Sequence, residues 1–422
     1  MMDSKRRIAI IGAGPIGLEA ALYGATLGDD VRVFERIEVG GNILDWGHVR
    51  MFSPWKMNVT PLGRRVAGLV SLVDDECPTG REFAESYLFA LAQALQLRER
   101  IFTGATVIHT ARKRKLKHDD IGHPRRSESP FRLMVRHASG KEVMVEADVV
   151  IDASGVYSNP SYMGDGGIPA LGELVNRHRI VYRLDDILGA DRAKYEGKTT
   201  LVVGAGHSAA TTIVALKVLA DAAPKTRAIW AVRANRKKPF EMNGNDPLSG
   251  RAALMKKCNE LAEGANPGIQ YLTGCTVESI AYHGATDQFD VVLNNGHAPL
   301  SMTVDRVIAH VGLGPDNSIY RQLQVHECYA TLGPMQLAAV LLGETSADCL
   351  AQQSHGPDQL KVPEPDFFIV GHKSYGTRAN FLLRVGHEQV RDVFKLIHRD
   401  PNLDLYQSPL HEASIPAAAI AR

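Results

Sequence analysis

Two stretches of this 422-residue chain repeat one local plan, and that repeat limits the folds open to it. The first reads RIAIIGAGPIGLEAALYGATLGDDVRVFER from Arg7, and the second reads KTTLVVGAGHSAATTIVALKVLADAAPKTRAIWAV from Lys198. Each predicts a short β-branched strand, a glycine-bearing turn, a helix and a second strand. Continuous apolar strands that alternate with helices are typical of parallel sheets buried on both faces. We therefore expect an α/β fold with two Rossmann-like units.

The first turn carries the spacing G-x-G-x-x-G at Gly12, Gly14 and Gly17. The first glycine permits the tight turn, the second admits a pyrophosphate, and the third lets the helix pack closely on the strand. Glu35 ends the next strand, at the offset expected for a carboxylate that accepts ribose hydroxyls. Because strand, glycines, helix, strand and acid occur in order, this segment predicts a dinucleotide site.

The second turn has Gly204 and Gly206, with Ala209 in the third position. No acid ends its second strand; a basic run follows instead, made of Arg233, Arg236, Lys237 and Lys238. A ribose 2′-phosphate needs cationic donors, so we expect NADPH rather than NADH here. The alternative is a solvated basic loop. His207 and Ser208 open the helix, and either could contact phosphate or cap the helix.

Composition excludes several other classes of protein. The net charge of +1 gives no general attraction to nucleic acid or membrane. The basic run 112–115 is interpreted as a solvated hairpin end. No apolar stretch has the length of a membrane span, so we expect a soluble, cytoplasmic protein. Five scattered cysteines offer no close pair for a disulfide scaffold or a zinc site, and no metal is expected: Cys77, Cys258, Cys275, Cys328 and Cys349.

Three further motifs resemble segments of the flavoproteins with two dinucleotide-binding domains. This group includes flavin-containing monooxygenases, the N-hydroxylases of ornithine and lysine, and thioredoxin-reductase-like enzymes. The motifs are DVVIDASGVYSNP (148–160), VDRVIAHVGLGPDNS (304–318) and PDFFIVGHKSYG (365–376). The resemblance implies an FAD domain made of residues 1–160 and 310–422, with an NADPH domain over 161–309 inserted between its two parts.

The resemblance also implies which residues bind the cofactors. FAD is expected to contact Gly12, Gly14, Gly17, Glu35, Arg36, Gly41, Trp46, Val107, Ala153, Gly155, Gly371 and Gly386. NADPH is expected to contact Gly204, Gly206, Ser208, Ala209, Arg233 and Arg236. His387 is expected near the pyrimidine edge of the flavin. The chain departs from its relatives at His372, where they commonly have Asp, and it lacks their paired redox cysteines and the F-x-G-x-x-x-H fingerprint.

An aperiodic segment from Gly40 to Gly63 concentrates two of the three tryptophans with cationic and polar residues. Such segments suit planar cofactors, so we expect it to line the flavin ring and the substrate pocket. The alternative is that the tryptophans are core anchors and the cations surface residues. The catalytic candidates are Trp55, Asn58 and His48; Trp46 and Arg50 belong to the same segment, and polar groups in Lys373–Arg378 are also expected to face the substrate.

The leading hypothesis is an FAD-dependent, NADPH-using monooxygenase that oxygenates a small amine or sulfur compound with O₂. The resemblance implies that this proceeds through a flavin C4a-hydroperoxide, with the protein supplying orientation and a dry pocket. The alternative is a reductase or oxidase that passes electrons to a quinone, a partner protein or O₂. A flavoprotein sensor of redox state is a third, non-enzymatic hypothesis. The sequence leaves the substrate unidentified and a homodimer open.

Overall fold

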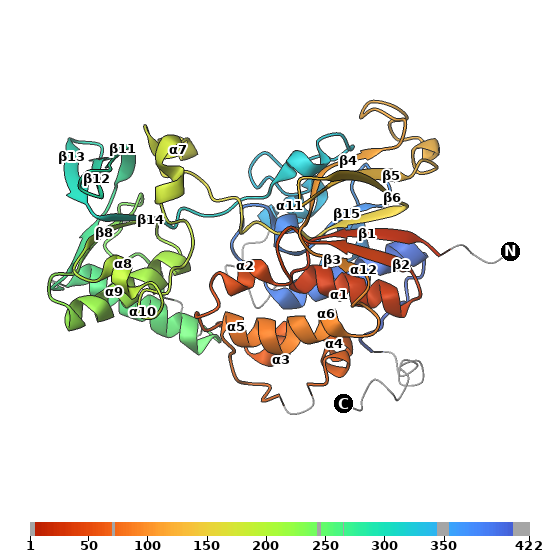
Figure 1. Cartoon of the computed structure of the whole chain (residues 1–422), viewed down its shortest axis with the longest axis horizontal. Helices are drawn as coiled ribbons and strands as arrows, with labels where there is room; N and C mark the ends of the chain where they lie inside the picture. The colour runs from red at the N-terminus through yellow and green to blue at the C-terminus, as the bar shows by residue number, and fades with distance from the viewer. Residues whose placement is uncertain (1–4, 70–71, 243–245, 265, 344–353, 408–422) are drawn as a thin grey trace. The chain divides into compact units, whose positions relative to one another are not determined.

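The computed structural model describes residues 5–69, 72–242, 246–264, 266–343 and 354–407. The chain divides into two compact units, one made of Met1–Asn159 with Gly314–Arg422 and the other of Pro160–Leu313. The second unit is thus an insertion in the first, and its bounds differ by a few residues from the range expected above. Both units are mixed α/β (Figure 1).

The first unit is built on a parallel five-stranded sheet with the order β15-β7-β1-β2-β3. The strands are β1 (Arg7–Ile11), β2 (Asp30–Phe34), β3 (Ile101–Phe102), β7 (Val149–Asp152) and β15 (Phe367–Ile369). The central strand β1 pairs in parallel with β2 on one side and with β7 on the other. The order therefore reverses at β1, which is the position where doubly wound sheets bind nucleotides.

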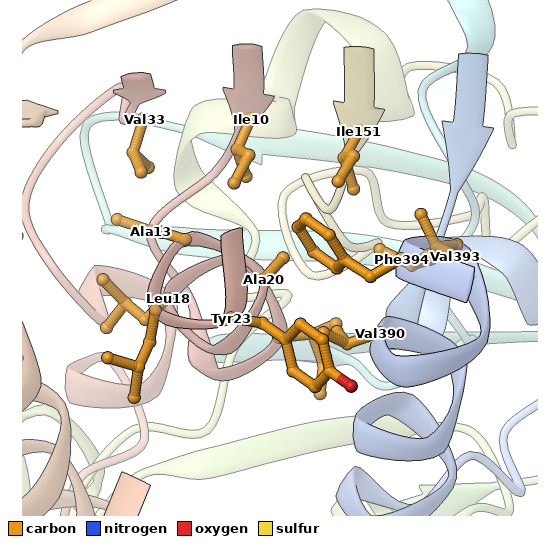
Figure 2. Packing of buried hydrophobic residues seen from close by; sticks show 14 of the residues in the cluster. Ile10, Ala13, Leu18, Ala20, Tyr23, Val33, Ile151, Val390, Val393 and Phe394 are labelled. Atoms are coloured by element: carbon orange, nitrogen blue, oxygen red, sulfur yellow. The ribbon is translucent and has the colours of Figure 1, made fainter. Parts of the chain in front are cut away.

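Helices cover one face of this sheet. Helix α1 (Pro15–Thr26) and helix α12 (Leu383–His398) pack together under the strands, and Figure 2 shows their apolar side chains meeting beneath Ile10 and Ile151. The rings of Tyr23 and Phe394 stack with centroids 5.0 Å apart. Among the described residues this unit also has the α-helices α2 (Gly41–Leu44), α3 (Trp55–Asn58), α4 (Pro61–Val66), α5 (Gly80–Phe83), α6 (Phe89–Gln93) and α11 (Met335–Gly343).

Between α5 and α6 the helix widens into a π-helical turn over Ala84–Leu88. The spacing of Thr79 and Glu82 predicts a capping box at the start of α5, and the structure has one, since each side chain binds the backbone N–H of the other residue. This satisfies two of the amides that a helix start leaves unpaired. The sequence of residues 79–95 predicts one regular helix, and the structure differs from that prediction by the π-helical turn.

The opposite face of the main sheet is covered by a smaller antiparallel sheet. It consists of β4 (Ala105–Arg112), β5 (Phe131–His137) and β6 (Glu142–Ala147). Its residues Val107 and Leu133 share one core with Ala9 and Ile11 of β1. The pair Ser139-Gly140 predicts a hairpin turn. It joins β5 to β6, and Gly140 has a φ of +84°.

The interpretation of residues 112–115 as a solvated hairpin end is wrong for Arg112. Its side chain is buried, and its Nε donates to Glu364 at 2.8 Å. Arg126 also donates to Glu364, with Nη2 2.7 Å from Oε2. The Arg112 guanidinium lies 3.7 Å from the centroid of the Phe131 ring. The partner carboxylate lies about 250 residues away in sequence, so a local charge pattern gives no sign of it.

The inserted unit contains a parallel sheet with the order β10-β9-β8-β14. Its strands are β8 (Thr199–Val203), β9 (Arg227–Ala231), β10 (Ile269–Leu272) and β14 (Arg306–Ala309), and its helices are α7 (Glu173–Asn176), α8 (Arg192–Tyr195), α9 (His207–Ala222) and α10 (Ser249–Glu263). An antiparallel sheet of β11 (Thr276–His283), β12 (Gln288–Asn294) and β13 (Pro299–Val304) completes it. The central strand β8 lies between β9 and β14, so the first unit's order reversal recurs.

Within the described residues, no helix combines the length and the apolar character that crossing a membrane requires.

Candidate dinucleotide sites

The turn after β1 has the backbone geometry that its glycines predicted. Gly12 has a φ of +100°, and a Cβ there would lie 2.9 Å from the carbonyl oxygen of Ala153. A Cβ on Gly17 would lie 1.9 Å from the carbonyl oxygen of Gly12. Both positions therefore exclude a side chain, the first because of the turn and the neighbouring strand, the second because the helix packs against the turn.

Gly14 differs from these two glycines. It is the N-cap of α1 in an extended conformation, Pro15 follows at the first helical position, and a Cβ on Gly14 would meet nothing within 4 Å. Its lack of a side chain is not needed for packing. The open space lies at the start of a 12-residue helix, where backbone N–H groups and the helix dipole favour a phosphate.

Glu35 is held beside this turn at the end of β2. Its carboxylate accepts the backbone N–H of Ala13 at 2.8 Å and that of Ile37 at 2.9 Å. The side chain of Arg36 reaches Ser158 Oγ at 2.5 Å, within the segment that follows β7. The structure thus brings Glu35 to the glycine turn, while its contact with a ribose remains a prediction.

The segment after β7 is fixed by a buried ion pair that the sequence did not predict. Lys373 Nζ lies 2.6 Å from Asp152 Oδ2, and both side chains are fully buried. The same ammonium donates to Ser154 Oγ at 3.0 Å and to the carbonyl of Asp316 at 2.8 Å. Lys373 was expected to face a substrate, but its three contacts instead join the returning strand to the C-terminal segment. Gly155 follows with a φ of +69° and open space around a Cβ.

Gly371 and Gly386 allow the start of α12 to approach the start of α1. A Cβ on Gly371 would lie 3.4 Å from Ile16, and one on Gly386 would lie 2.5 Å from the same side chain. The N–H of Gly371 donates to Gln389 Oε1 at 2.8 Å. The N-termini of two helices therefore meet at the carboxyl edge of the sheet, which is the edge that binds nucleotides in such folds.

Two buried histidines belong to this C-terminal region. His372 stacks on Phe381 with centroids 5.6 Å apart, and burial lowers the pKa of its imidazole. Burial lowers the pKa of His387 to about 3, so this imidazole is neutral at pH 7. Its Nε2 has no hydrogen-bond partner within the described part of the chain. A buried polar atom without a partner fits a site that a polar ligand completes.

In the aperiodic segment the structure separates buried residues from exposed ones. Trp55 is buried against Phe83, with ring centroids 5.8 Å apart, as a core anchor would be. Asn58 is buried, accepts from Ser53 Oγ at 2.8 Å, and donates to the Ser53 carbonyl at 2.9 Å. His48 and Arg50 are exposed. A catalytic role for Trp55, Asn58 or His48 remains a prediction.

Other expected FAD residues lie near the glycine turn or in the core. The N–H of Gly40 donates to the carbonyl of Ala13 at 3.0 Å, which places Gly41 at the start of α2 close to the turn. Trp46 is half-buried and packs where a Cβ on Gly80 would lie, 2.7 Å from its ring. Val107 is buried in β4. That Gly41, Trp46 and Val107 contact FAD remains a prediction.

The turn after β8 repeats the geometry of the first. Gly204 has a φ of +129°, and a Cβ there would lie 2.1 Å from the carbonyl oxygen of His310, the residue after β14. Gly206 is the N-cap of α9, and a Cβ on it would meet nothing within 4 Å. Ala209 is fully buried at the third position. A phosphate can therefore approach the second helix as it can the first.

The residues around this second turn are mostly exposed. Ser208 and Arg233 are exposed, and Arg233 lies two residues beyond the end of β9. His207 stacks on Phe240 with centroids 5.6 Å apart, and no side chain caps α9. Arg236 Nη1 lies 2.9 Å from Glu241 Oε1 at the surface. The basic run thus lies at the carboxyl end of β9, where a ribose would bind.

The thiols form no redox pair among the described residues. Four cysteines there are free of disulfides, and Cys349 lies outside the described residues. Burial raises the pKa of Cys258 to about 12 and raises that of Cys275. In the same part of the chain, no group of three or more His, Cys, Asp or Glu side chains could hold a metal.

Short segments of the chain match known proteins or protein families. Residues 7–45 match the family model described as pyridine nucleotide-disulphide oxidoreductase. A curated relative, kynurenine 3-monooxygenase of Chaetomium globosum, is 50% identical over 34 residues. That match spans only 8% of this chain and 7% of the relative's length, so it extends over a small part of either protein.

Similar solved structures cover nearly the whole chain. The bacillithiol disulfide reductase of Bacillus cereus has a TM-score of 0.64 at 18% identity, over 94% of this chain and 100% of its own. The cadaverine monooxygenase DfoA of Erwinia amylovora, solved with FAD, has a TM-score of 0.63 at 11% sequence identity. The match covers 94% of this chain and 96% of DfoA. The ornithine N-hydroxylase KtzI of Kutzneria, solved with reduced FAD, NADP⁺ and L-ornithine, has a TM-score of 0.59 at 12% sequence identity. The match covers 94% of this chain and 99% of KtzI.

These similarities agree with the two glycine turns and confirm the expected fold. They also support the expectation of an oxidoreductase with FAD and a pyridine nucleotide as its cofactors. The chain therefore has the fold of the flavoproteins with two dinucleotide-binding domains, a group of FAD- and NAD(P)H-dependent oxidoreductases.

Proposed function

We propose that this protein is an FAD-dependent, NADPH-using monooxygenase that acts on a small amine or sulfur compound. The observation that carries the proposal is the pair of glycine turns, at Gly12–Gly17 and Gly204–Ala209, each with one glycine open to a phosphate. Two nucleotide sites in one chain allow one nucleotide to reduce the other. Similarity to the cadaverine and ornithine hydroxylases supports oxygenation of an amine.

The first unit fits FAD. Its diphosphate would lie at the start of α1 over Gly14, with Glu35 at the adenosine side of β1. The flavin half would then extend over β7 and β15, toward the start of α12 and His387. When bound, FAD supplies the hydride acceptor and the reaction with O₂. The chain's own residues bind and orient it, and Lys373 with Asp152 holds two of the segments around it.

The second unit fits NADPH. Gly206 leaves room for the diphosphate, and the exposed Arg233 lies at the end of β9, where a 2′-phosphate would need a cation. Arg236 is held by Glu241, so its charge is partly offset in the free protein. This arrangement favours NADPH over NADH and supports a larger role for Arg233 than for Arg236.

A disulfide-type reductase is the second candidate, and one thiol favours it. Hydrogen bonds from Thr331 lower the pKa of Cys328, in contrast to the raised pKa of Cys77. A thiolate is the reactive form of cysteine. The side chain of Cys328 is nevertheless buried, and none of the described cysteines is paired with a second one. Structural similarity to the bacillithiol disulfide reductase also supports a reductase function.

The experiment compares oxygen chemistry with thiol chemistry. NADPH-reduced protein is mixed with O₂ in the presence of candidate amines and sulfides, while NADPH loss, hydrogen peroxide and oxygenated product are measured. A monooxygenase converts a nucleophilic substrate and releases less peroxide per NADPH when that substrate is present. Cys328→Ser should leave this coupling unchanged, because no thiol takes part.

Release of all reducing equivalents as peroxide with every nucleophile, together with disulfide reduction that Cys328→Ser abolishes, would favour the reductase. Cys275→Ser is the matched control, since that thiol is also buried but has a raised pKa.

A further inference from the structure

The loop between β4 and β5, residues 113–130, is anchored to the first unit from inside the fold. Figure 1 shows it in orange, projecting beyond the ends of the two strands. The buried guanidinium of Arg126 donates through Nη1 to the carbonyls of Leu116 at 3.0 Å and Asp119 at 2.9 Å. Gln324 Nε2 donates to the same Asp119 carbonyl at 3.0 Å. Buried side chains therefore fix the backbone of a loop that the sequence presents as a solvated basic run.

Two successive turns form the tip of this loop. The N–H of Asp119 donates to the carbonyl of Leu116 at 3.2 Å, and that of His123 donates to the carbonyl of Asp120 at 3.1 Å. Leu116 begins the first turn and Ile121 lies within the second; they are 62% and 74% exposed. Single exposed aliphatic residues are ordinary on a protein surface. Here two of them are held in water on one fixed tip.

The exposed charge of the loop is mostly positive. Its exposed cationic side chains are those of Arg114, Lys117 and Arg125. Glu128 is the exposed acid of the loop, and the two aspartates are half-buried and engaged. Asp119 Oδ2 accepts the N–H of Leu116 at 2.8 Å, and Asp120 forms an ion pair with Lys115. The net charge of +1 for the whole chain averages out this local excess of cations.

We propose that this tip docks the protein on an anionic lipid bilayer. Leu116 and Ile121 insert at the level of the headgroups, and the three exposed cations bind lipid phosphates. Apolar side chains flanked by Lys and Arg bind such an interface, because burial of the first and attraction of the second act together. The inference goes beyond the proposed function and holds for a monooxygenase or a reductase alike.

The size and composition of the tip favour a bilayer over other anionic partners. A stable protein interface takes about 20–30 residues from each side, more than this tip presents. Single-stranded nucleic acid is bound by stacking bases on aromatic side chains, and residues 113–130 contain no Phe, Tyr or Trp. A fluid bilayer adapts to a small projecting tip, so two aliphatic side chains and three cations suffice for reversible binding.

The test is sedimentation of the full-length, FAD-loaded protein with vesicles of phosphatidylcholine, alone or mixed with phosphatidylglycerol. Wild type should bind the anionic vesicles, bind the neutral ones far less, and be released by high salt. Leu116→Ser/Ile121→Ser should weaken binding by about tenfold or more, because two aliphatic side chains no longer leave water. Arg114→Gln/Arg125→Gln should weaken it by about tenfold and reduce its dependence on salt.

Matched variants of the same unit control for general loss of apolar surface and of charge. Val73→Ser/Leu95→Ser removes two aliphatic side chains from residues of similar exposure, 55% and 58%. Arg32→Gln/Arg98→Gln removes two cations whose side chains are 52% and 53% exposed. Both variants should bind the anionic vesicles as wild type does.

Several results would overturn the inference. One is a wild type that stays in the supernatant with anionic vesicles, and another is binding that neither tip variant weakens. Equal loss in the control variants would show that the tip has no special part. Self-association or capture of an acidic protein in place of vesicles, lost in Leu116→Ser/Ile121→Ser, would assign the surface to a protein partner. If that variant fails to fold, wild-type lipid binding by Arg114→Gln/Arg125→Gln contradicts the inference.

Discussion

Glu19 carries a carboxyl group on the buried face of α1, with no exposed surface. Thr60 Oγ1 donates to it at 2.8 Å and the Tyr87 hydroxyl at 3.3 Å. These donors favour the ionised form, but burial outweighs them and raises the pKa of Glu19 to about 7. The residue therefore titrates near neutral pH inside the fold, in a network that joins three elements of the first unit.

The stability of the protein should consequently depend on pH through Glu19. The folded state keeps the proton up to about pH 7, whereas the unfolded chain loses it above about 4.5, so its contribution is complete below 4.5 and lost as pH rises to 7. The loss is on the order of 3 kcal/mol. Urea unfolding between pH 5 and 8 should show this decline in wild type and not in Glu19→Gln.

Glu99→Gln provides the comparison for this measurement, because that side chain is 86% exposed. It should retain the wild-type pH profile. An unchanged profile in Glu19→Gln as well would show that Glu19 is ionised in the fold throughout this range.

Prediction from sequence at the level of residues succeeded where the backbone dictates the residue type. Gly12, Gly17 and Gly204 are required by close backbone approach, and such positions can be read from spacing. Ion pairs between distant segments could not be read. Lys373 finds Asp152 across 221 residues of sequence, and only the strand order brings them together.

At the level of elements, each unit uses the same strand–turn–helix piece, and the three glycines of the first unit serve different purposes. Gly17 is needed for the fold, because a Cβ would lie 1.9 Å from a backbone oxygen. Gly14 is not needed for the fold, because a Cβ would meet open space. The two positions therefore separate the stability of the element from its ability to bind a diphosphate.

Substitution by alanine should reveal this separation. Gly17→Ala should lower the free energy of unfolding by about 1–3 kcal/mol, as overpacking does. Gly14→Ala should stay within about 0.5 kcal/mol of wild type and yet lose FAD, since the added methyl group occupies the phosphate space. Unfolding curves and flavin content after purification measure the two effects.

Gly206→Ala is the matched control in the second unit, where a Cβ also meets open space. It should retain FAD. Full FAD retention by Gly14→Ala would mean that the diphosphate binds elsewhere.

The sequence predicted strands and helices from periodicity, and the first strand of each repeat ends at the predicted turn. It missed the π-helical turn at Ala84–Leu88, since one extra residue in a helical turn leaves the local pattern almost unchanged. It also left the segment 40–63 without elements, and short helices α2, α3 and α4 lie there. Helices of four to six residues are too short to show an apolar period.

At the level of the whole molecule, the chain consists of one dinucleotide-binding unit inserted into another. The sequence motifs predict this insertion. Each repeat begins with its own glycine turn, and the strands β7 and β15 return to the first sheet. What sequence reasoning could not supply is the substrate. Pocket side chains come from aperiodic loops, whose conformations follow from tertiary contacts rather than from a local pattern.

The most direct test of this account is anaerobic mixing of the purified protein with NADPH while the flavin absorbance is recorded. We expect that the protein binds an equimolar amount of FAD and that NADPH bleaches the visible absorption band of the flavin. NADH should do so more slowly at equal concentration, because Arg233 has no 2′-phosphate to bind. A folded protein that takes up no added FAD, or bound FAD that NADPH leaves oxidised, would contradict the claim that the two glycine turns hold two cooperating nucleotides.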